Sequence, residues 1–488
     1  MENSAKRATF ATKLGILAAT AGSAVGLGNI WRFPSQTAQD GGAIFFFIYI
    51  ACVVFFGAPV VLAEFITGRA GKANASRAYK NLAPGKKFYL FGIFSTLTAF
   101  LILGYYMVVS GWTFYYLYLA LTGTLSHTTN FEALFQDLVN DAPAQIASMA
   151  AIVIFSAGIV AFGVKKGIEL SSKLMMPLML GVMFVLCVRA LTLPGAGEGL
   201  AYLWKPNFEN AASAGTRIFT DALGQSFFSL SLGMGVLMVY ASYFKKEVRL
   251  VRTTGLMAGL DTAIAVLAGI VIFPAAFALA DDPGTMVETL KTGGPGLVFI
   301  AIPKLLQVLP AAGLWSLLFF LLLALAALTS AISLFEVVTA YIHEEFRFTL
   351  PKKVAPAPAA DGTPDGNAEP RIFRQEYRFS RPFSVMLVSV GVIILGVLSA
   401  CSLGENSQVT LFGRTFFYWL DCLSAKILLP SGGIFISLFV GWYLDEKLLR
   451  GELASAGPVS DRFFKAYRFI LRWIAPTGIA VVLICGLL

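Results

Sequence analysis

The chain has 488 residues, of which 57% are hydrophobic and only 13% are charged, and its mean hydropathy is +0.74. This balance excludes a soluble globular protein. The formal net charge of +9 does not indicate a nucleic-acid-binding surface, because the basic residues are spread over short loops between apolar stretches. We therefore expect a membrane protein.

Eleven apolar stretches are long enough to cross about 30 Å of hydrocarbon as α-helices. They cover residues 14–38, 42–68, 88–122, 146–164, 170–192, 217–242, 254–279, 312–345, 383–402, 415–444 and 467–488. Most of the 37 Lys and Arg residues fall in every second loop, and such basic loops face the cytoplasm. The N-terminus is therefore expected in the cytoplasm, and eleven crossings bring the C-terminus to the outer side.

The segments outside the apolar stretches are short. Residues 1–13 form a cytoplasmic tail, and residues 445–488 form a cytoplasmic loop and the last span. The cytoplasmic loop 346–382 contains a Pro- and Ala-rich linker over 351–370, which we expect to be flexible rather than folded. The outer segment 281–310 mixes Gly, Pro and Asp with apolar residues, which indicates either a folded loop with short helices or a plain connector.

The five Cys and two His residues show no metal-ligand spacing, and the Cys residues lie in or beside apolar stretches. No disulfide framework, nucleophile–base pair or phosphate-binding loop is indicated. We expect neither an enzyme nor a nucleic-acid partner. The expected partners are a small molecule and the lipid bilayer, and the oligomeric state is left open.

A glycine-rich polar patch interrupts the first apolar stretch. Gly22, Gly26 and Gly28 lie in its middle, followed by Asn29 and Arg32. Non-helical backbone deep in a bilayer is tolerated only where it is packed in protein or lines a cavity. A kinked helix packed through small residues would explain the glycines but not Asn29 and Arg32. An interrupted span of this kind points to the binding site of a transporter.

The sixth apolar stretch contains a second weak helix, over residues 224–235. Ser229, Ser231, Gly233 and Gly235 lie in its middle. Two interrupted spans separated by five spans fit an inverted repeat. Helix ends exposed at mid-membrane present N–H groups to anions and carbonyls to cations. A substrate carboxylate and Na⁺ are the expected ligands.

Residues 22–34 read Gly-Ser-Ala-Val-Gly-Leu-Gly-Asn-Ile-Trp-Arg-Phe-Pro, which resembles the first-span signature of the neurotransmitter:sodium symporters. Residues 166–169, 204–206, 224–233 and 327–330 are similar to the bacterial amino-acid branch of that family. The resemblance covers nearly the whole chain in the same order. It implies an all-α membrane protein of five plus five spans in inverted repeat, residues 14–192 and 217–444, with one further helix. It also implies Na⁺-coupled amino-acid transport by alternating access in a bacterial inner membrane.

The resemblance implies two Na⁺ sites built from oxygen atoms, which hard cations prefer. The first would be completed by the substrate carboxylate and would use groups of Ala24, Asn29, Ser229 and Asp261. The second would use carbonyls and hydroxyls of Gly22, Val25, Ala326, Thr329 and Ser330. From the residues alone, the hydroxyls of Thr329 and Ser330 could instead bond back to their own helix.

Asp261 stands at the position of the family's seventh-span Asn. The resemblance implies that chloride-dependent members are neutral in this span and borrow an anion, whereas Asp261 would supply the negative charge itself. We therefore predict chloride-independent transport, with a protonation step at Asp261 as a further option. The alternative is that Asp261 marks a helix end near the membrane edge.

By resemblance, the substrate pocket is apolar and carries no side-chain charge, which suits hydrophobic or aromatic L-amino acids. Tyr106 would donate its hydroxyl to the substrate carboxylate. Monoamine carriers of the family have Asp at the position of Gly26, so the carboxylate must come from the substrate here. The predicted lining is Ala24, Gly26, Leu27, Gly28, Ile102, Tyr106, Phe228, Ser229, Ser231, Met234, Ser330 and Leu334. From the residues alone, such an apolar set could be ordinary core packing.

The resemblance also implies two gates. The outer gate would pair Arg32 with Asp421, with Gln225 sharing the cation. The inner gate would join Arg7 and Phe10 of the tail to Ser242, Tyr243 and Glu344. Unwinding between Gly167 and Pro177 could open an inward water route to the second sodium site, although a plain helix start with a kink fits these two residues as well.

Two other functions use the same bundle. An amino-acid sensor would be expected to carry a large soluble output domain, and the longest soluble segment, 351–380, is too poor in apolar residues to fold. A proton-coupled carrier or exchanger is disfavoured by the oxygen-rich set of Asn29, Ser229, Thr329 and Ser330.

Overall fold

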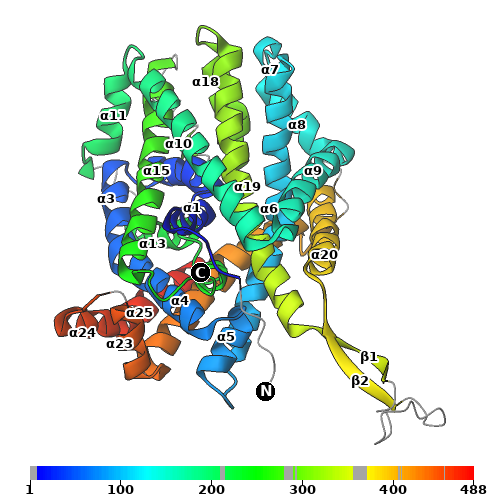
Figure 1. Ribbon diagram of the computed structural model, residues 1–488. Helices are drawn as coiled ribbons and strands as arrows, with labels where there is room; N and C mark the ends of the chain where they lie inside the picture. The colour runs from blue at the N-terminus through cyan, green and yellow to red at the C-terminus, as the bar shows by residue number, and fades with distance from the viewer. Residues whose placement is uncertain are drawn as a thin grey trace, which may run out of the picture.

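The computed structural model describes residues 8–208, 215–279, 290–291, 294–354, 371–404, 407, 409–455 and 457–487. This part of the chain is mainly helical, and its long apolar helices run between the two ends of one bundle (Figure 1). Helices dominate because a backbone in hydrocarbon has no water to bond and must satisfy its own polar groups.

The first five spans follow in chain order. They are α1 (Lys13–Ala24), η1 (Gly28–Arg32) and α2 (Phe33–Gln39); α3 (Ala43–Cys52), η2 (Val53–Gly57) and α4 (Ala58–Gly71); α6 (Tyr89–Leu121); α9 (Ala142–Ala161); and η3 (Val164–Glu169) with α10 (Leu170–Leu191). The segments labelled η are π-helical turns, which recur at functional positions of helices. The first span bends by 54° at its break.

The other six spans complete the bundle. They are α13 (Arg217–Ser229) with α14 (Val236–Ala241); α15 (Leu250–Leu279); α19 (Ala312–Glu345); α20 (Arg381–Cys401); α21 (Phe416–Cys422), η5 (Leu423–Leu428), α22 (Leu429–Leu438) and η6 (Phe439–Tyr443); and α24 (Asp461–Phe469), η7 (Ile470–Ile474) and α25 (Ala475–Leu487).

The span count agrees with the sequence. In the described residues, 9 continuous helices are long and apolar enough to cross a membrane, and the bent first span raises the number to 10. The α13–α14 pair, interrupted over residues 230–235, supplies the eleventh. The prediction of a helical membrane bundle is confirmed, while the inverted relation between its two halves stays a prediction.

Short elements cover the two ends of the bundle (Figure 1). One end carries α5 (Ala75–Leu82) and α23 (Glu446–Ala454), and the other carries α7 (Thr124–His127), α8 (Phe131–Asn140), α11 (Ala196–Trp204), α17 (Gly294–Gly296), η4 (Leu297–Ala301), α18 (Ile302–Gln307) and the strands β3 (Thr410–Leu411) and β4 (Arg414–Thr415). The helix from Gly294 to Gln307 favours the folded-loop interpretation of segment 281–310. Residues 280–289 and 292–293 of that region lie outside the described residues.

The loop 346–382 departs from our prediction. Strands β1 (Arg347–Val354) and β2 (Arg371–Arg378) pair in an antiparallel hairpin, so part of the expected flexible linker is ordered and the fold is not purely helical. The prediction gave most weight to the prolines, but strand pairing tolerates Pro at an edge. Residues 355–370 lie outside the described residues.

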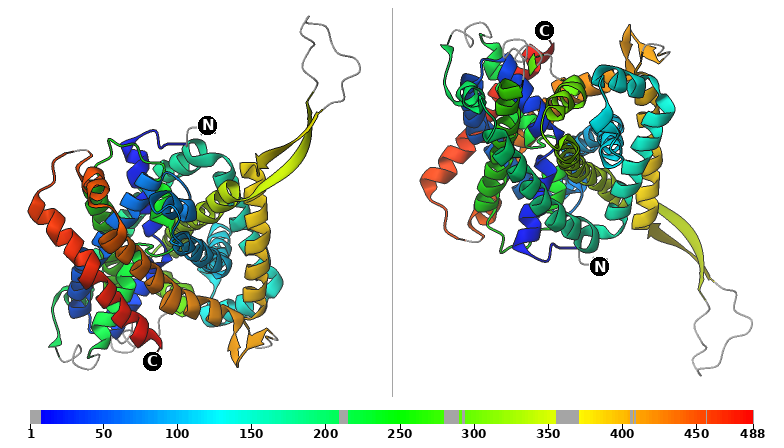
Figure 2. Two further views of the ribbon diagram at one scale, coloured as in Figure 1. Left: turned by 90° about the horizontal axis from the view of Figure 1, so that it is seen from below. Right: turned by 90° about the horizontal axis from the view of Figure 1, so that it is seen from above.

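The first span lies at the centre of the bundle. Figure 1 shows α1 between α3 and α13 on one side and α6 and α19 on the other. Figure 2 shows the same arrangement from both ends. The two interrupted spans therefore place their breaks inside protein, where loose backbone groups can find partners.

Candidate functional site

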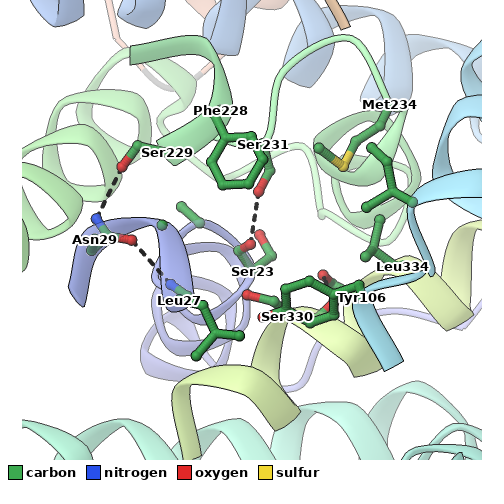
Figure 3. Close-up of a pocket in the computed structure, with 15 residues that line it drawn as sticks. Ser23, Leu27, Asn29, Tyr106, Phe228, Ser229, Ser231, Met234, Ser330 and Leu334 are labelled. Carbon is green, nitrogen blue, oxygen red and sulfur yellow. Dashed lines mark hydrogen bonds between the residues drawn. The ribbon is translucent and has the colours of Figure 1, made fainter. Parts of the chain in front are cut away.

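The breaks in the first and sixth spans meet in the middle of the bundle. Helix α1 ends at Ala24, and Val25 is extended. In the sixth span Ser231 has φ +56°, and Gly233 and Gly235 also have positive φ. The Ser231 hydroxyl donates to the Ser23 carbonyl at 2.9 Å and so joins the two breaks (Figure 3).

The glycines of the first break are needed because other segments of the chain approach them closely. A Cβ on Gly26 would lie 2.6 Å from Ser330 Oγ, and one on Gly28 would lie 2.7 Å from Phe228 Cε1. Such distances are far below van der Waals contact, so any larger residue would displace a wall of the site. The glycines of the first break are therefore needed for close packing, since neither Gly26 nor Gly28 has a positive φ.

A small buried cavity lies between the two breaks and the helices α6 and α19. Its volume is about 40 Å³, which holds only a few water molecules, so an amino-acid-sized ligand requires the walls to part. It is lined by Ser23, Ala24, Gly26, Leu27, Gly28, Asn29, Ile102, Tyr106, Phe228, Ser229, Ser231, Met234, Ser330, Ser333 and Leu334. All the residues of the predicted pocket are among them.

Two serines of this lining were missed. Ser23 and Ser333 lie one turn or less from residues that we did predict, and both donate to helix carbonyls, to Thr20 and Ser330 respectively. A serine that bonds back to its own helix is common in spans and gives no distinct signal in the sequence.

The Tyr106 hydroxyl is a polar group without a partner in this cavity. It lies beside Leu27 and Ser330 but completes no hydrogen bond with any described residue. A buried hydroxyl without a partner costs free energy, and this one lies at the wall of the cavity, where a ligand could satisfy it. The opposite wall is apolar, with Phe228 and Met234 facing the same space (Figure 3).

Four side chains from four spans converge beside this cavity, and two of them, Asn29 and Ser229, also line it. Asn29 Nδ2 donates to Ser229 Oγ at 2.9 Å and to Asp261 Oδ1 at 2.8 Å, and Ser229 Oγ donates to Asp261 Oδ2 at 2.6 Å. Tyr49 approaches Ser229 and Asp261 from α3. Asp261 is fully buried within the 30-residue helix α15, so it is not a helix end at the membrane edge.

This cluster has the donor set of a monovalent cation site. Carboxylate, hydroxyl and amide oxygens from the predicted residues lie together, and the last-turn carbonyl of Ala24 lacks a continuing helix. The Asn29 amide currently turns its NH₂ toward Asp261, and its Oδ1 accepts from the Gly26 N–H at 3.0 Å. Holding a cation through Oδ1 requires this amide to rotate.

Residues predicted for the second ion site also lie close together. Ser330 Oγ lies 3.3 Å and Thr329 Oγ1 lies 3.4 Å from the Val25 carbonyl, across the gap between α19 and the end of α1. Thr329 also donates to Ala326 at 3.0 Å, so the back-bonded alternative and the interspan contact coexist. A Cβ added to Gly22 would lie 3.6 Å from the Cβ of Thr329, so these two residues face each other.

The predicted outer gate has a different immediate contact. The Arg32 guanidinium lies 4.5 Å from the centre of the Phe228 ring, and Gln225 Nε2 donates to the Gly28 carbonyl at 3.2 Å. Asp421 on α21 acts on Arg32 electrostatically. None of the ion pairs among the described residues joins Arg32 to Asp421, and the contact that the guanidinium makes is with the ring of Phe228.

The predicted inner gate brings the tail onto the sixth span. Phe10 is buried, donates its N–H to the Tyr243 carbonyl at 3.2 Å, and contacts the rings of Tyr240 and Tyr243. Ser242 follows α14 in the same segment. Glu344 accepts from the Asn74 backbone at 2.8 Å. Arg7 lies outside the described residues.

Sequence reasoning missed three buried groups around these sites. Glu64 on α4 accepts the Gly233 N–H at 2.8 Å and so satisfies a backbone donor of the second break. Tyr49 contacts the Asp261 cluster, and Glu336 accepts from the Tyr243 hydroxyl at 2.6 Å. An acidic residue inside a span was the available signal for Glu64 and Glu336. Tyr49 lies in an aromatic run that gives none.

Two helices broken around one small cavity, within a bundle of about eleven spans, define a secondary transporter. The residues 7–142 and 129–355 match the model of the sodium:neurotransmitter symporter family. The chain belongs to this family, and it is a sodium-dependent multi-pass membrane transporter.

Individual relatives are also sodium-dependent transporters or share the fold. The chain is 32% identical over 98% of its length to an uncharacterized sodium-dependent transporter of Bacillus subtilis, YhdH, and covers 97% of it. It is 32% identical to a Haemophilus influenzae protein of the same description, covering 99% of both chains. It is 30% identical to the bovine sodium- and chloride-dependent creatine transporter 1, over 66% of this chain and 58% of that protein. The crystal structure of MhsT in complex with L-phenylalanine superposes with a TM-score of 0.82 at 36% identity, covering 98% of this chain and all of MhsT.

Proposed function

We propose that this protein is a Na⁺-coupled symporter of hydrophobic or aromatic L-amino acids that works by alternating access without chloride. The observation that supports the proposal most is that the Asp261 cluster lies beside the break in the first span, where no acidic side chain is present. The first break offers no acidic side chain, since Gly26 has no room for one. A zwitterion would bring its own carboxylate to the Asn29 and Ser229 side of the cavity.

Coupling follows from the shared ligand. Because the substrate carboxylate would complete the first cation shell, each solute would raise the affinity for the other by the same factor. Tyr106 would donate its unpaired hydroxyl to the other carboxylate oxygen. The positive dipole end of the half-helix that starts at Gly28 would favour a carboxylate at the same place.

Substrate class follows from the apolar wall. Ile102, Phe228, Met234 and Leu334 line the part of the cavity away from the Asp261 cluster. Met234 is flexible and polarizable, so this wall can adapt to aliphatic or aromatic groups. The solved structure of MhsT holds L-phenylalanine, which supports an aromatic substrate.

Chloride independence rests on charge balance. Asp261 brings a fixed negative charge to the first ion cluster, and Ser229 and Asn29 hold it in place. An intrinsic carboxylate makes an external anion unnecessary. The second cation would lie between the end of α1 and Thr329 with Ser330.

Access would alternate between two ends that hold different contacts. We assign the end with the basic loops to the cytoplasm of a bacterial inner membrane. Phe10 packed on Tyr243 closes that end, and Arg32 over Phe228 covers the cavity from the other. Single contacts of this kind are worth only about 1 kcal/mol, which suits gates that must open during each cycle.

Uptake into proteoliposomes tests the proposal. Purified protein is given a Na⁺ or K⁺ gradient, labelled L-phenylalanine or L-leucine, and either chloride or gluconate outside. We expect uptake that requires Na⁺ and is equal in both anions. Uptake driven equally by a proton gradient without Na⁺ would favour the carrier or exchanger alternative, and binding without uptake would favour the sensor.

A further inference from the structure

The β1–β2 hairpin has two unlike faces. Rings at Phe346, Phe348, Tyr377 and Phe379 follow one another along one side, which we call the aromatic face. Phe348 lies 5.8 Å from Tyr377 and 5.5 Å from Phe379, and Phe346 lies 6.5 Å from Phe379, all between ring centres and nearly parallel. The register pairs Arg347 with Arg378 between these rings, on the opposite side.

The aromatic face is open in this chain. Phe346 is 49% exposed, Phe348 is 38% exposed and Tyr377 is 37% exposed. A two-stranded hairpin is only marginally stable in water unless its apolar side packs on something. A surface that covers the three exposed rings would therefore stabilise the hairpin.

Basic residues dominate the two strands. Their sequences contain a single acidic residue, Glu376, and the basic residues Arg347, Lys352, Lys353, Arg371, Arg374 and Arg378. The sequence of segment 355–370, which connects the strands, contains three acidic residues and no basic residue. The strand sequences thus complement an anionic surface, while the sequence of the connecting segment does not.

The aromatic face continues the lipid-facing side of a span. Phe379 lies 5.0 Å from Phe383, which is 40% exposed in the first turn of α20. Met386, Val390 and Ile394 follow at helical spacing, each 50% exposed or more. Outward apolar residues of a span contact lipid, so the aromatic face begins where this lipid-facing side ends.

The root of the hairpin is fixed to the bundle. Arg381 forms an ion pair with the buried Glu336 and donates Nε to the Val160 carbonyl at 2.8 Å. His343 Nδ1 lies 2.7 Å from the Phe379 carbonyl. Figure 2 shows the hairpin passing beyond the edge of the bundle, and Figure 1 shows it at the same end as the N-terminus.

We propose that the hairpin is a lipid-binding arm that lies on the cytoplasmic leaflet and recognises anionic phospholipid headgroups. Aromatic rings favour the boundary between headgroups and acyl chains, and basic residues beside them attract phosphate groups. A soluble acidic protein would satisfy the basic residues but would not continue the lipid-facing side of α20. The assignment rests on the proposed orientation of the basic loops toward the cytoplasm, and it is independent of the substrate.

Neighbouring positions on opposite faces provide the test. Full-length protein without its five native Cys residues receives a single Cys by Phe348→Cys or Thr349→Cys, each labelled with bimane. The labelled proteins are reconstituted in vesicles of phosphatidylcholine alone or with 30% phosphatidylglycerol, each carrying a headgroup-level nitroxide lipid as quencher. We expect several-fold stronger quenching at 348 than at 349 in anionic vesicles, and less quenching at 348 in neutral vesicles or in 0.5 M salt.

Charge reversal separates lipid recognition from simple proximity. Arg374→Glu with Arg378→Glu should reduce the quenching at 348 in anionic vesicles to the level in neutral vesicles. The matched control, Lys86→Glu with Lys87→Glu, reverses two exposed charges at the same end and should change nothing. Absence of quenching at 348 in anionic vesicles, with normal Na⁺-driven uptake, would overturn the proposal that the hairpin binds lipid. It would point instead to a soluble acidic partner. Equal quenching in neutral and anionic vesicles would overturn headgroup recognition.

Discussion

Asn29 donates a hydrogen bond from Nδ2 to Asp261 Oδ1 at 2.8 Å, which ties the break in the first span to the middle of the seventh. Both residues are fully buried. Buried carboxylates persist only with partners that compensate for lost hydration. The pair therefore links the charge of the ion cluster to the backbone that lines the cavity.

The charge of Asp261 should decide the anion requirement. Asp261→Ser removes the carboxylate and keeps a hydroxyl near Asn29 and Ser229. We expect uptake in gluconate to fall about tenfold or more, because roughly 1.4 kcal/mol of lost stabilisation has this effect, and chloride to restore it. Uptake is measured in proteoliposomes with and without chloride. Asp137→Ser, at an exposed position of α8, is the control, and loss of uptake in both anions would contradict the charge argument.

The space at Gly26 should be indispensable for binding. A Cβ there would lie 2.6 Å from Ser330 Oγ inside the cavity lining. Gly26→Ala should weaken substrate binding at least tenfold in a scintillation-proximity assay. Gly158→Ala on α9 meets no atom within 4 Å and should leave binding unchanged. Normal affinity in Gly26→Ala would place the substrate elsewhere.

The hydroxyl of Tyr106 should contribute to binding and not to folding. It has no hydrogen-bond partner among the described residues, so Tyr106→Phe removes a buried polar group without breaking a bond. We expect an unchanged or higher Tm without ligand and a substrate Kd raised about 5- to 30-fold. Tyr116→Phe removes a similarly unpartnered hydroxyl from the same helix and should leave the Kd unchanged. An equal effect of both changes would remove the ligand contact assigned to Tyr106.

Asp40, just beyond the first span, should make stability depend on pH. Burial and the nearby Asp221 raise the pKa of Asp40 to about 6, although Arg217 opposes the shift. The folded protein then binds more protons than the unfolded chain between about pH 4 and pH 6, so this group's contribution to stability is lost as pH rises through 6.

The pH prediction is checked with Asp40→Asn, which stays neutral and can still accept from Arg217. We expect the variant to be more stable than the parent at pH 7.5 by on the order of 1–2 kcal/mol, and the difference to disappear near pH 4. Thermal unfolding in detergent at the two pH values measures it. A variant that is less stable at pH 7.5 would show that the Arg217 ion pair outweighs burial.

The two breaks could be predicted from the sequence, because their residues are unfavourable in a regular membrane-spanning helix. Glycines beside Asn29 in one span, and serines beside Gly233 in another, have no place in a regular apolar helix, and they mark both breaks. Their partners were harder to predict, because Tyr49 and Ser333 look like ordinary span residues. Which spans lie side by side is a property of the three-dimensional packing, and only that packing brings Tyr49 to Asp261.

The β1–β2 hairpin, in contrast, was not predicted from the sequence. Its strands are rich in basic residues and flank a segment rich in Pro and Ala, a composition typical of a linker, but aromatic and basic residues also alternate where the strands meet, at Phe346–Phe348 and Tyr377–Phe379. The contact between Arg32 and the ring of Phe228 was not predicted either, because it depends on how the first and sixth spans are positioned relative to each other.

The central claim is that a substrate carboxylate and a Na⁺ ion share the Asn29, Ser229 and Asp261 cluster. A Na⁺ titration of purified protein tests it most directly, in the presence of L-phenylalanine or of phenylethylamine, which lacks only the carboxylate. We expect L-phenylalanine to lower the half-saturating Na⁺ concentration about tenfold or more, and phenylethylamine to leave it unchanged. In Asn29→Ala, this difference between the two compounds should disappear. An equal effect of both compounds, or an undiminished effect in Asn29→Ala, would contradict it.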